Sequence, residues 1–141
     1  PVYNMFNRYI EKEVIPLSER NGIGQVVFSP LAQGLLTGKY RKGAPVPENS
    51  RAADPQAGSM IKNLLTDDRL EKVEQLRAVA DELGITLSQL ALAWILRQPN
   101  VASALIGASR PEQVEENVKA SGMTLSGDVL ERIEHILNGQ N

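Results

Sequence analysis

The sequence predicts an α/β fold, and two observations support that prediction. Two short apolar segments, residues 24–28 and 101–106, have the length and the flanking turn residues of strands. Five other segments repeat apolar residues every three or four positions, as helices do. Because neither strand alternates charged and apolar residues, we expect both to be covered on two faces, as in a parallel sheet.

The predicted helices are bounded by residues that favour helix ends. The first is expected from about residue 7 to the stop at Asn21-Gly22, with Ile10, Val14 and Leu17 on its apolar face. The other four are expected at about 67–83 after a Thr66 cap, from Thr86 with Gln89 completing a capping box, at 111–120, and at 127–137 after Ser126.

The composition excludes several classes of function. The chain is 42% hydrophobic and 23% charged with a net charge of −2, which gives no general attraction for nucleic acid or for an anionic membrane. No apolar run approaches the ~20 residues that span a bilayer. There is no cysteine and His135 is the only histidine, so we expect neither a His- or Cys-ligated metal nor a Ser-His-Asp triad. A cytoplasmic location is expected.

The predicted sheet is too small to close on itself. Two strands, or three if the residues around Tyr3 end an earlier strand, cannot form a parallel barrel. Either further sequence supplies the neighbouring strands, or the strands pair with another copy in a homo-oligomer. The chain opens at Pro1 with neither a Met nor a signal region, so we expect a longer protein entered midway.

A candidate anion site follows the second strand. Residues 101–106 lead through the segment GASRPE, residues 107–112, into a helix. A helix N-terminus offers backbone N–H groups and a positive dipole, Gly107 permits close approach, and Arg110 adds a full charge. Ser109 and Glu112 also have the spacing of an ordinary capping box. The spacing favours neither interpretation, and the two are compatible.

A second candidate segment follows the first strand. Phe28 is succeeded by SPLAQG, residues 29–34, whose small residues allow a bulky ligand to approach the backbone. The Phe28 ring can stack on a planar ligand, although periodicity alone favours a core position for it.

The long irregular segment 29–65 is basic. Its stretch 39–51 carries Lys39, Arg41, Lys42 and Arg51, with only Glu48 opposing them. Such a loop beside a helix N-terminus suits a polyphosphate ligand, and a solvated charged loop is an equally compatible interpretation.

Taken together, these segments resemble the aldo-keto reductase family, in the branch with bacterial general-stress reductases and potassium-channel β-subunits. The matching strings lie in family order over most of the chain: YNMFNR from Tyr3, FSPLAQGLLTGKY from Phe28, SRAA from Ser50, LALAWILR from Leu90, and ALIGASRPEQVEEN from Ala104.

The resemblance implies a (β/α)8 TIM barrel. Residues 1–141 would be the C-terminal cofactor-binding half of a single barrel domain, with residues 24–28 and 101–106 as its seventh and eighth strands and the helix from about Gly127 packed outside. The missing N-terminal half of the barrel would then complete the core.

The resemblance also implies a site for NADP(H). Phe28 would stack on the nicotinamide, and Ser109 with Arg110 would favour NADPH over NADH because of its additional phosphate. The implied cofactor-binding residues are Phe28, Ser29, Pro30, Leu31, Ala32, Gln33, Lys39, Arg51, Gly107, Ser109, Arg110, Gln113, Glu116 and Asn117.

The implied activity of the complete protein is hydride transfer from NADPH to a small aldehyde or ketone. The family's catalytic Asp, Tyr, Lys and His come from earlier strands, so this segment would contain no catalytic residue and would be inactive alone. The alternative is a nucleotide-sensing regulatory subunit of the channel β-subunit type.

Overall fold

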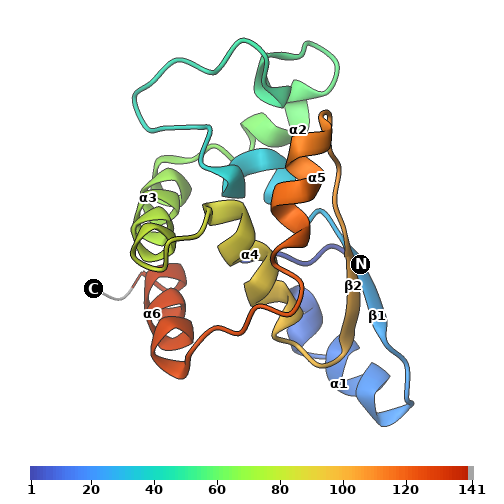
Figure 1. Ribbon diagram of the computed structural model, residues 1–141. Coiled ribbons are helices and arrows are strands. Elements are labelled where there is room, and N and C mark those ends of the chain that lie inside the picture. The colour runs from blue at the N-terminus through green and yellow to red at the C-terminus, as the bar shows by residue number, and fades with distance from the viewer. Residues whose placement is uncertain (140–141) are drawn as a thin grey trace.

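The computed structural model describes residues 1–139 as a two-stranded parallel sheet with helices packed against it (Figure 1). The elements are, in chain order, η1 (Tyr9–Glu11), α1 (Val14–Arg20), β1 (Gln25–Phe28), η2 (Ala32–Thr37), η3 (Arg51–Ala53), α2 (Gly58–Lys62), α3 (Asp67–Glu82), α4 (Leu87–Leu96), β2 (Val101–Leu105), α5 (Pro111–Val118) and α6 (Gly127–Leu137), where η denotes a 3-10 helix.

The two predicted strands pair with each other in parallel. Phe28 of β1 lies opposite Leu105 of β2, so both strands end at the same edge of the sheet. Val2 forms a single parallel bridge with Phe28, which agrees with the expectation that the N-terminal residues end an earlier strand.

One face of the sheet is open in this chain. Val27 is fully buried toward the helices, whereas Val26, Phe28 and Leu105 are exposed. The prediction that both strands are covered on two faces is therefore wrong for residues 1–139 taken alone. The strands carry apolar residues on both faces, and the described residues cover only one of them.

The first predicted helix is two short helices. The 3-10 helix η1 ends at Glu11, and α1 begins at Val14. Pro16 explains the break, because its missing N–H and its ring are tolerated in the first turn of α1 but not inside a helix that begins at residue 7. Leu17, expected on the buried face, is 55% exposed.

The central helix α4 follows its predicted start closely. The backbone N–H of Gln89 donates to Thr86 Oγ1 at 3.2 Å, and the backbone N–H of Thr86 donates to Gln89 Oε1 at 3.1 Å, which completes the expected capping box. The side chains from Leu87 to Ile95 are all buried. A helix that is apolar on every side belongs at the centre of a core, and Figure 1 shows α4 between the strands and the pair α3 and α6.

The caps predicted for α3 and α6 are also present. Thr66 accepts from the backbone N–H of Arg69, and Ser126 accepts from that of Val129. Arg132 of α6 forms a two-pronged ion pair with Glu82 of α3. The outer helix is thereby attached to the helical layer.

The segment 29–65 is less irregular than expected. It contains η2, η3 and α2, and it places Leu35, Leu36 and Ile61 in the core. Its glycines and prolines interrupt the helices so often that no helical period emerges in the sequence.

Within residues 1–139, no single helix has the length and apolar character needed to cross a bilayer; only α3 and α4 counted together, at a bend of 90°, meet that test.

Candidate cofactor-binding cleft

A cleft of about 1320 Å³ lies where β1 and β2 end. Its volume exceeds the ~300–1,000 Å³ that is usual for one small ligand, so it has room for a dinucleotide. Of the residues implied by the resemblance, all but Ala32 line it: Phe28, Ser29, Pro30, Leu31, Gln33, Lys39, Arg51, Gly107, Ser109, Arg110, Gln113, Glu116 and Asn117. Segments that are some 80 residues apart in sequence thus line one cleft.

Phe28 is available to a ligand. Its side chain is 50% exposed and lines the cleft, whereas its neighbour Val27 is fully buried. Within residues 1–139, Phe28 therefore does not take the core position that periodicity favoured. Ala32, in contrast, is buried and does not line the cleft, so the structure does not place it with the other implied cofactor residues.

We call residues 28–39 the β1 wall of the cleft. Its backbone is strained, because Ser29, Ala32 and Gln33 have φ values of 55°, 49° and 61° without being glycine. Each such residue costs about 1–3 kcal/mol and persists only where its surroundings hold it. Such strain is concentrated at binding sites, and nothing in the local residue types announced it.

Side-chain hydrogen bonds hold this wall together. Gln33 donates through Nε2 to Ser29 Oγ at 3.2 Å, and its Oε1 accepts from Arg51 of η3. Arg77 of α3 donates to the carbonyl of Gly38, at the end of η2. Arg77 lines the cleft as well, and sequence reasoning missed it because α3 carries no motif around it.

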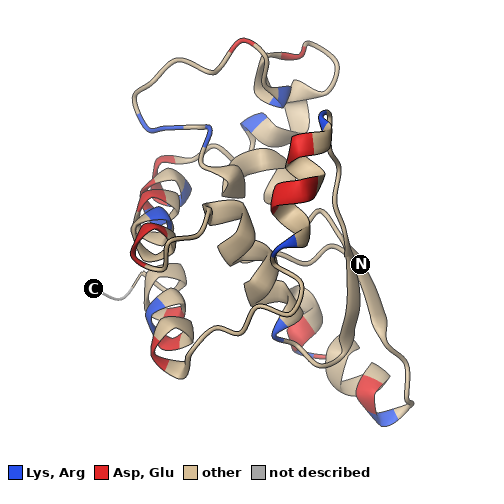
Figure 2. Ribbon diagram, in the orientation of Figure 1, with Lys and Arg blue, Asp and Glu red and all other residues tan. Residues whose placement is uncertain are grey.

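The basic residues of the long segment fall into two groups. Lys39 and Arg51 line the cleft. Arg41 lies 3.9 Å from Glu74, and Lys42 pairs with Glu71, both acids of α3. The hydrogen bond from Lys42 to Glu71 raises the Lys42 pKa. Figure 2 shows the acidic residues along α3 beside this loop. Arg41 and Lys42 therefore pair with acids of α3, and of these four basic residues only Lys39 and Arg51 line the cleft.

We call residues 105–110 the β2 wall. A Cβ added at Gly107 would meet nothing within 4 Å, so the backbone there is open to close approach. Arg110 is the N-cap residue of α5 and is exposed at the cleft. The expected placement of a glycine and a cation at this turn is present.

The capping box that the spacing of Ser109 and Glu112 allowed does not form, and Gln113 caps the turn instead. Gln113 Oε1 accepts from the backbone N–H groups of Ser109 and Arg110 at 2.8 and 3.3 Å. Pro111 has no N–H, and the N–H of Gln113 donates to the Arg110 carbonyl at 3.2 Å. The N–H groups of Ser109, Arg110 and Gln113 therefore already have a partner.

The far end of the cleft is supported by the capping box of α4. Gln89 Nε2 donates to the carbonyl of Glu116 at 2.9 Å, which ties α5 to the start of α4. Glu116 and the buried Asn117 line the cleft beside this contact. A carboxylate and an amide suit the hydroxyl and amino groups of a nucleoside better than a phosphate.

A polar cluster lies behind the β1 wall. Tyr3 is fully buried against Trp94, and its hydroxyl donates to Glu11 Oε1 at 2.6 Å. Burial, with that hydrogen bond to Glu11, raises the pKa of Tyr3 to about 12. Burial pushes the Glu11 pKa upward, but hydrogen bonds from Arg8 and Tyr3 outweigh it and lower that pKa. Arg97 stacks 3.7 Å from the Trp94 ring centre.

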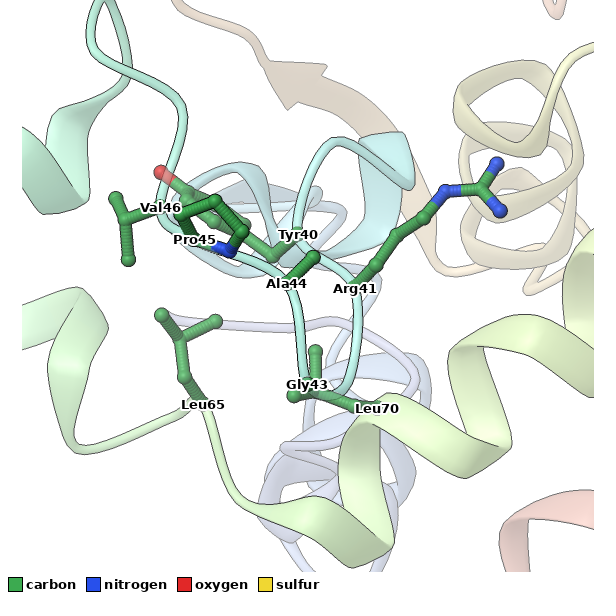
Figure 3. A pocket seen from close by; sticks show the side chains of 8 residues that line it. All are labelled: Tyr40, Arg41, Gly43, Ala44, Pro45, Val46, Leu65 and Leu70. Atoms are coloured by element: carbon green, nitrogen blue, oxygen red, sulfur yellow. The ribbon is translucent and has the colours of Figure 1, made fainter.

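A second, smaller pocket of about 180 Å³ lies under the loop that precedes η3 (Figure 3). Tyr40, Val46, Leu65 and Leu70 are among the side chains around it, with Arg41 pointing away to one side. None of the implied cofactor residues lines this pocket, so it is separate from the cleft.

The comparison with known families decides the relationship of the chain. Residues 1–138 match the model described as the aldo/keto reductase family. The chain belongs to the aldo-keto reductase family.

Relatives within the aldo-keto reductases have two kinds of name. A probable voltage-gated potassium channel subunit beta from Arabidopsis thaliana is 46% identical and is matched by 99% of this chain over 43% of its own length. An L-glyceraldehyde 3-phosphate reductase from Escherichia coli strain K12 is 39% identical, with 99% of this chain covering 41% of that protein. The chain thus spans less than half the length of these relatives.

A solved aldo-keto reductase has the same fold over this region. The structure of a glycerol dehydrogenase from Gluconobacter oxydans matches with a TM-score of 0.78 at 28% identity, covering 99% of this chain and 42% of that one. That protein is a TIM barrel of the family, and the two-stranded, helix-rich chain is consistent with part of such a barrel.

Proposed function

We propose that the protein containing this chain is an NADP(H)-dependent aldo-keto reductase that transfers hydride to a small aldehyde or ketone, and that this chain holds the cofactor. The observation that carries the proposal is the cleft at the strand ends, which gathers Phe28, Lys39 and Arg110 around one space. Ligands of parallel α/β folds bind at this edge of the sheet.

The residues fit a dinucleotide from end to end. The exposed Phe28 ring would shelter the nicotinamide, and Ser29 to Gln33 would follow the pyrophosphate with Lys39 and Arg51 as counter-charges. Open space at Gly107 leaves room for the adenosine side. When bound, the nicotinamide supplies the hydride, and the described side chains bind and orient it.

Selectivity for the additional phosphate of NADPH would depend mainly on the Arg110 guanidinium. Gln113 already occupies the N–H groups of Ser109 and Arg110, so a phosphate can use them only if the Gln113 side chain turns away. A guanidinium needs no such rearrangement and binds phosphate through two parallel hydrogen bonds.

In this proposal, residues 1–141 supply the seventh and eighth strands of a (β/α)8 barrel. The exposed Val26 and Leu105 would then be covered inside the barrel by the preceding half of the protein. The catalytic Asp, Tyr, Lys and His would come from that half, and residues 1–141 alone would have no reductase activity.

A regulatory subunit is the second candidate. The relatives named as potassium channel β-subunits are 46%, 41% and 42% identical, against 38% and 39% for those named as glyceraldehyde 3-phosphate reductases. Such a protein would bind the nucleotide through the same cleft. Turnover separates the two, since an enzyme oxidises NADPH repeatedly with an aldehyde and a pure sensor does not.

The test is a pair of substitutions in the full-length protein, Arg110→Met and Lys39→Met. We expect Arg110→Met to weaken NADPH binding about 10- to 100-fold and to leave NADH nearly unchanged, because a charged hydrogen bond is worth about 1.5–3 kcal/mol. Lys39→Met should weaken both, because both carry the pyrophosphate. Quenching of protein fluorescence gives each Kd.

Two results of this experiment would contradict the proposal. A full-length protein that binds neither dinucleotide would refute the proposal, and an equal loss of both upon Arg110→Met would remove the assignment of the phosphate to Arg110. Consumption of NADPH with small aldehydes then chooses between reductase and sensor.

A further inference from the structure

Two buried asparagines hold the two ends of β1. Asn4 is 4% exposed, and its Nδ2 donates to the carbonyl of Ser29, just past the end of the strand, at 2.9 Å. Asn100 is 7% exposed, and its Nδ2 donates to the carbonyl of Ile23, just before the strand begins, at 2.7 Å. The two bonds are alike in donor, acceptor and burial.

The surroundings of the two asparagines differ. The carbonyl held by Asn4 belongs to Ser29, whose φ of 55° turns the chain out of the strand and into the cleft wall. The carbonyl held by Asn100 belongs to Ile23, at the opposite end of the strand and away from the cleft residues. Only the first bond acts on backbone that faces the proposed cofactor.

The Asn4 amide is held from both of its atoms. Its Oδ1 accepts from the backbone N–H of Phe6 at 2.9 Å while its Nδ2 donates to Ser29. Reversing the amide would place donor against donor and acceptor against acceptor, so a single orientation satisfies both contacts.

The Asn4 contact lies next to the backbone bridge between the N-terminal residues and β1. The Tyr3 N–H donates to the Phe28 carbonyl at 3.3 Å, and the chain then turns away at Asn4, whose N–H donates to the Asn7 carbonyl. The carbonyl of Ser29, the first residue after β1, accepts from the Asn4 side-chain amide. It accepts the N–H of Ala32 as well, at 3.2 Å.

We propose that Asn4 is a positioning residue for the dinucleotide. By fixing the Ser29 carbonyl it holds Ser29 in its left-handed conformation, and this sets where the Phe28 ring and the backbone after it face the nicotinamide and the pyrophosphate. The proposal rests on the proposed function of the cleft. It adds a residue that does not line the cleft and acts through Ser29.

The test compares Asn4→Asp with Asn100→Asp in the full-length protein. Each change removes one amide donor, and Asp at position 4 keeps an acceptor for the Phe6 N–H. Both variants should lower the melting temperature. We expect Asn4→Asp to raise the Kd of NADPH and of NADH tenfold or more, to a similar extent, because Ser29 lies away from the additional phosphate. Asn100→Asp should leave both Kd values within twofold of the wild type.

Two further variants distinguish a loss of Ser29 positioning from a general loss of stability in Asn4→Asp. Asn4→Ala deletes the donor without adding charge and should act in the same direction. Adding Ser29→Gly to Asn4→Asp should recover part of the lost affinity, since glycine adopts a φ of 55° without the amide. A general loss of stability would not be repaired by that change.

The outcomes distinguish a failure of the Asn4 proposal from a failure of the proposed cofactor-binding function. A wild-type protein that binds neither NADPH nor NADH overturns the proposed function and this inference with it. If the wild type binds, and Asn4→Asp matches Asn100→Asp in Kd, or Ser29→Gly restores nothing, the positioning role of Asn4 is overturned while the cofactor site stands.

Discussion

The two walls of the cleft are built in opposite ways. The β1 wall, residues 28–39, has left-handed backbone at Ser29, Ala32 and Gln33, and it is fastened by hydrogen bonds from Asn4, Arg51 and Arg77. The β2 wall, residues 105–110, is exposed or half-buried throughout, and its turn is capped by a single side chain, that of Gln113.

The difference indicates where each wall gains its function. The β1 wall is shaped before a ligand arrives, because strained backbone is stable only when its surroundings hold it. The β2 wall satisfies its own amides with a side chain that a ligand can displace. We therefore expect changes in the first wall to act through stability and shape, and changes in the second to act through binding.

The largest contrast is expected between Gly38→Ala and Gly107→Ala. Gly38 has a φ of 78°, and a Cβ there would lie 2.7 Å from Arg77 Nη2. Alanine at this position should cost about 3 kcal/mol of unfolding free energy, from backbone strain and from displacement of Arg77. Gly107 has neither constraint, so its alanine variant should stay within about 0.5 kcal/mol of wild type.

Urea unfolding of the full-length protein measures both variants, and nucleotide binding provides the second readout. Gly107→Ala should weaken NADPH binding despite its normal stability, because the added methyl group fills space at the β2 wall. Equal losses of stability in the two variants would contradict the contrast between a preformed wall and an open one.

A smaller effect is expected from the cluster behind the β1 wall. The pKa of Tyr3 is raised from 10.0 to about 12 by burial and by its bond to Glu11. The folded state therefore keeps the Tyr3 proton that the unfolded state loses, and stability falls as pH rises from 10 toward 12. The loss amounts to about 2 kcal/mol near pH 12.

Tyr3→Phe isolates this effect, because it removes the titrating hydroxyl and keeps the ring against Trp94. As the pH is raised from 9 to 11.5, the urea midpoints of wild type and variant should converge, because only the wild type loses the stability that the protonated Tyr3 hydroxyl provides. Parallel curves for the two proteins would mean that Tyr3 does not titrate abnormally.

The sequence predicted the elements whose signals are local. The capping residues Thr66, Thr86 and Ser126 start their helices as expected, and the two strands lie where short apolar runs predicted them. Most of the implied cleft residues came from family resemblance rather than from periodicity, and they do face one cleft.

The remaining features depend on contacts between distant residues. The pairing of Lys42 with Glu71 and the bond from Asn4 to Ser29 join segments that are 29 and 25 residues apart, so no local spacing reveals them. Left-handed backbone at Gln33 has no glycine to announce it. The break before α1 could have been found, since Pro16 cannot lie inside a helix that begins at residue 7.

The smallest expected effect concerns the cap of the β2 wall. Gln113→Ala should cost about 1 kcal/mol of stability, the usual value of a lost cap, while Glu112→Ala should change stability by less than about 0.5 kcal/mol. Released from Gln113, the N–H groups of Ser109 and Arg110 become available to a phosphate, so the affinity for NADPH should rise relative to NADH. Urea unfolding and the two Kd values measure this. A larger stability loss from Glu112→Ala than from Gln113→Ala would mean that Glu112 caps the turn, as the spacing allowed. If Gln113→Ala instead lowers the affinity for NADPH relative to that for NADH, Gln113 is a direct ligand of the cofactor and not its competitor.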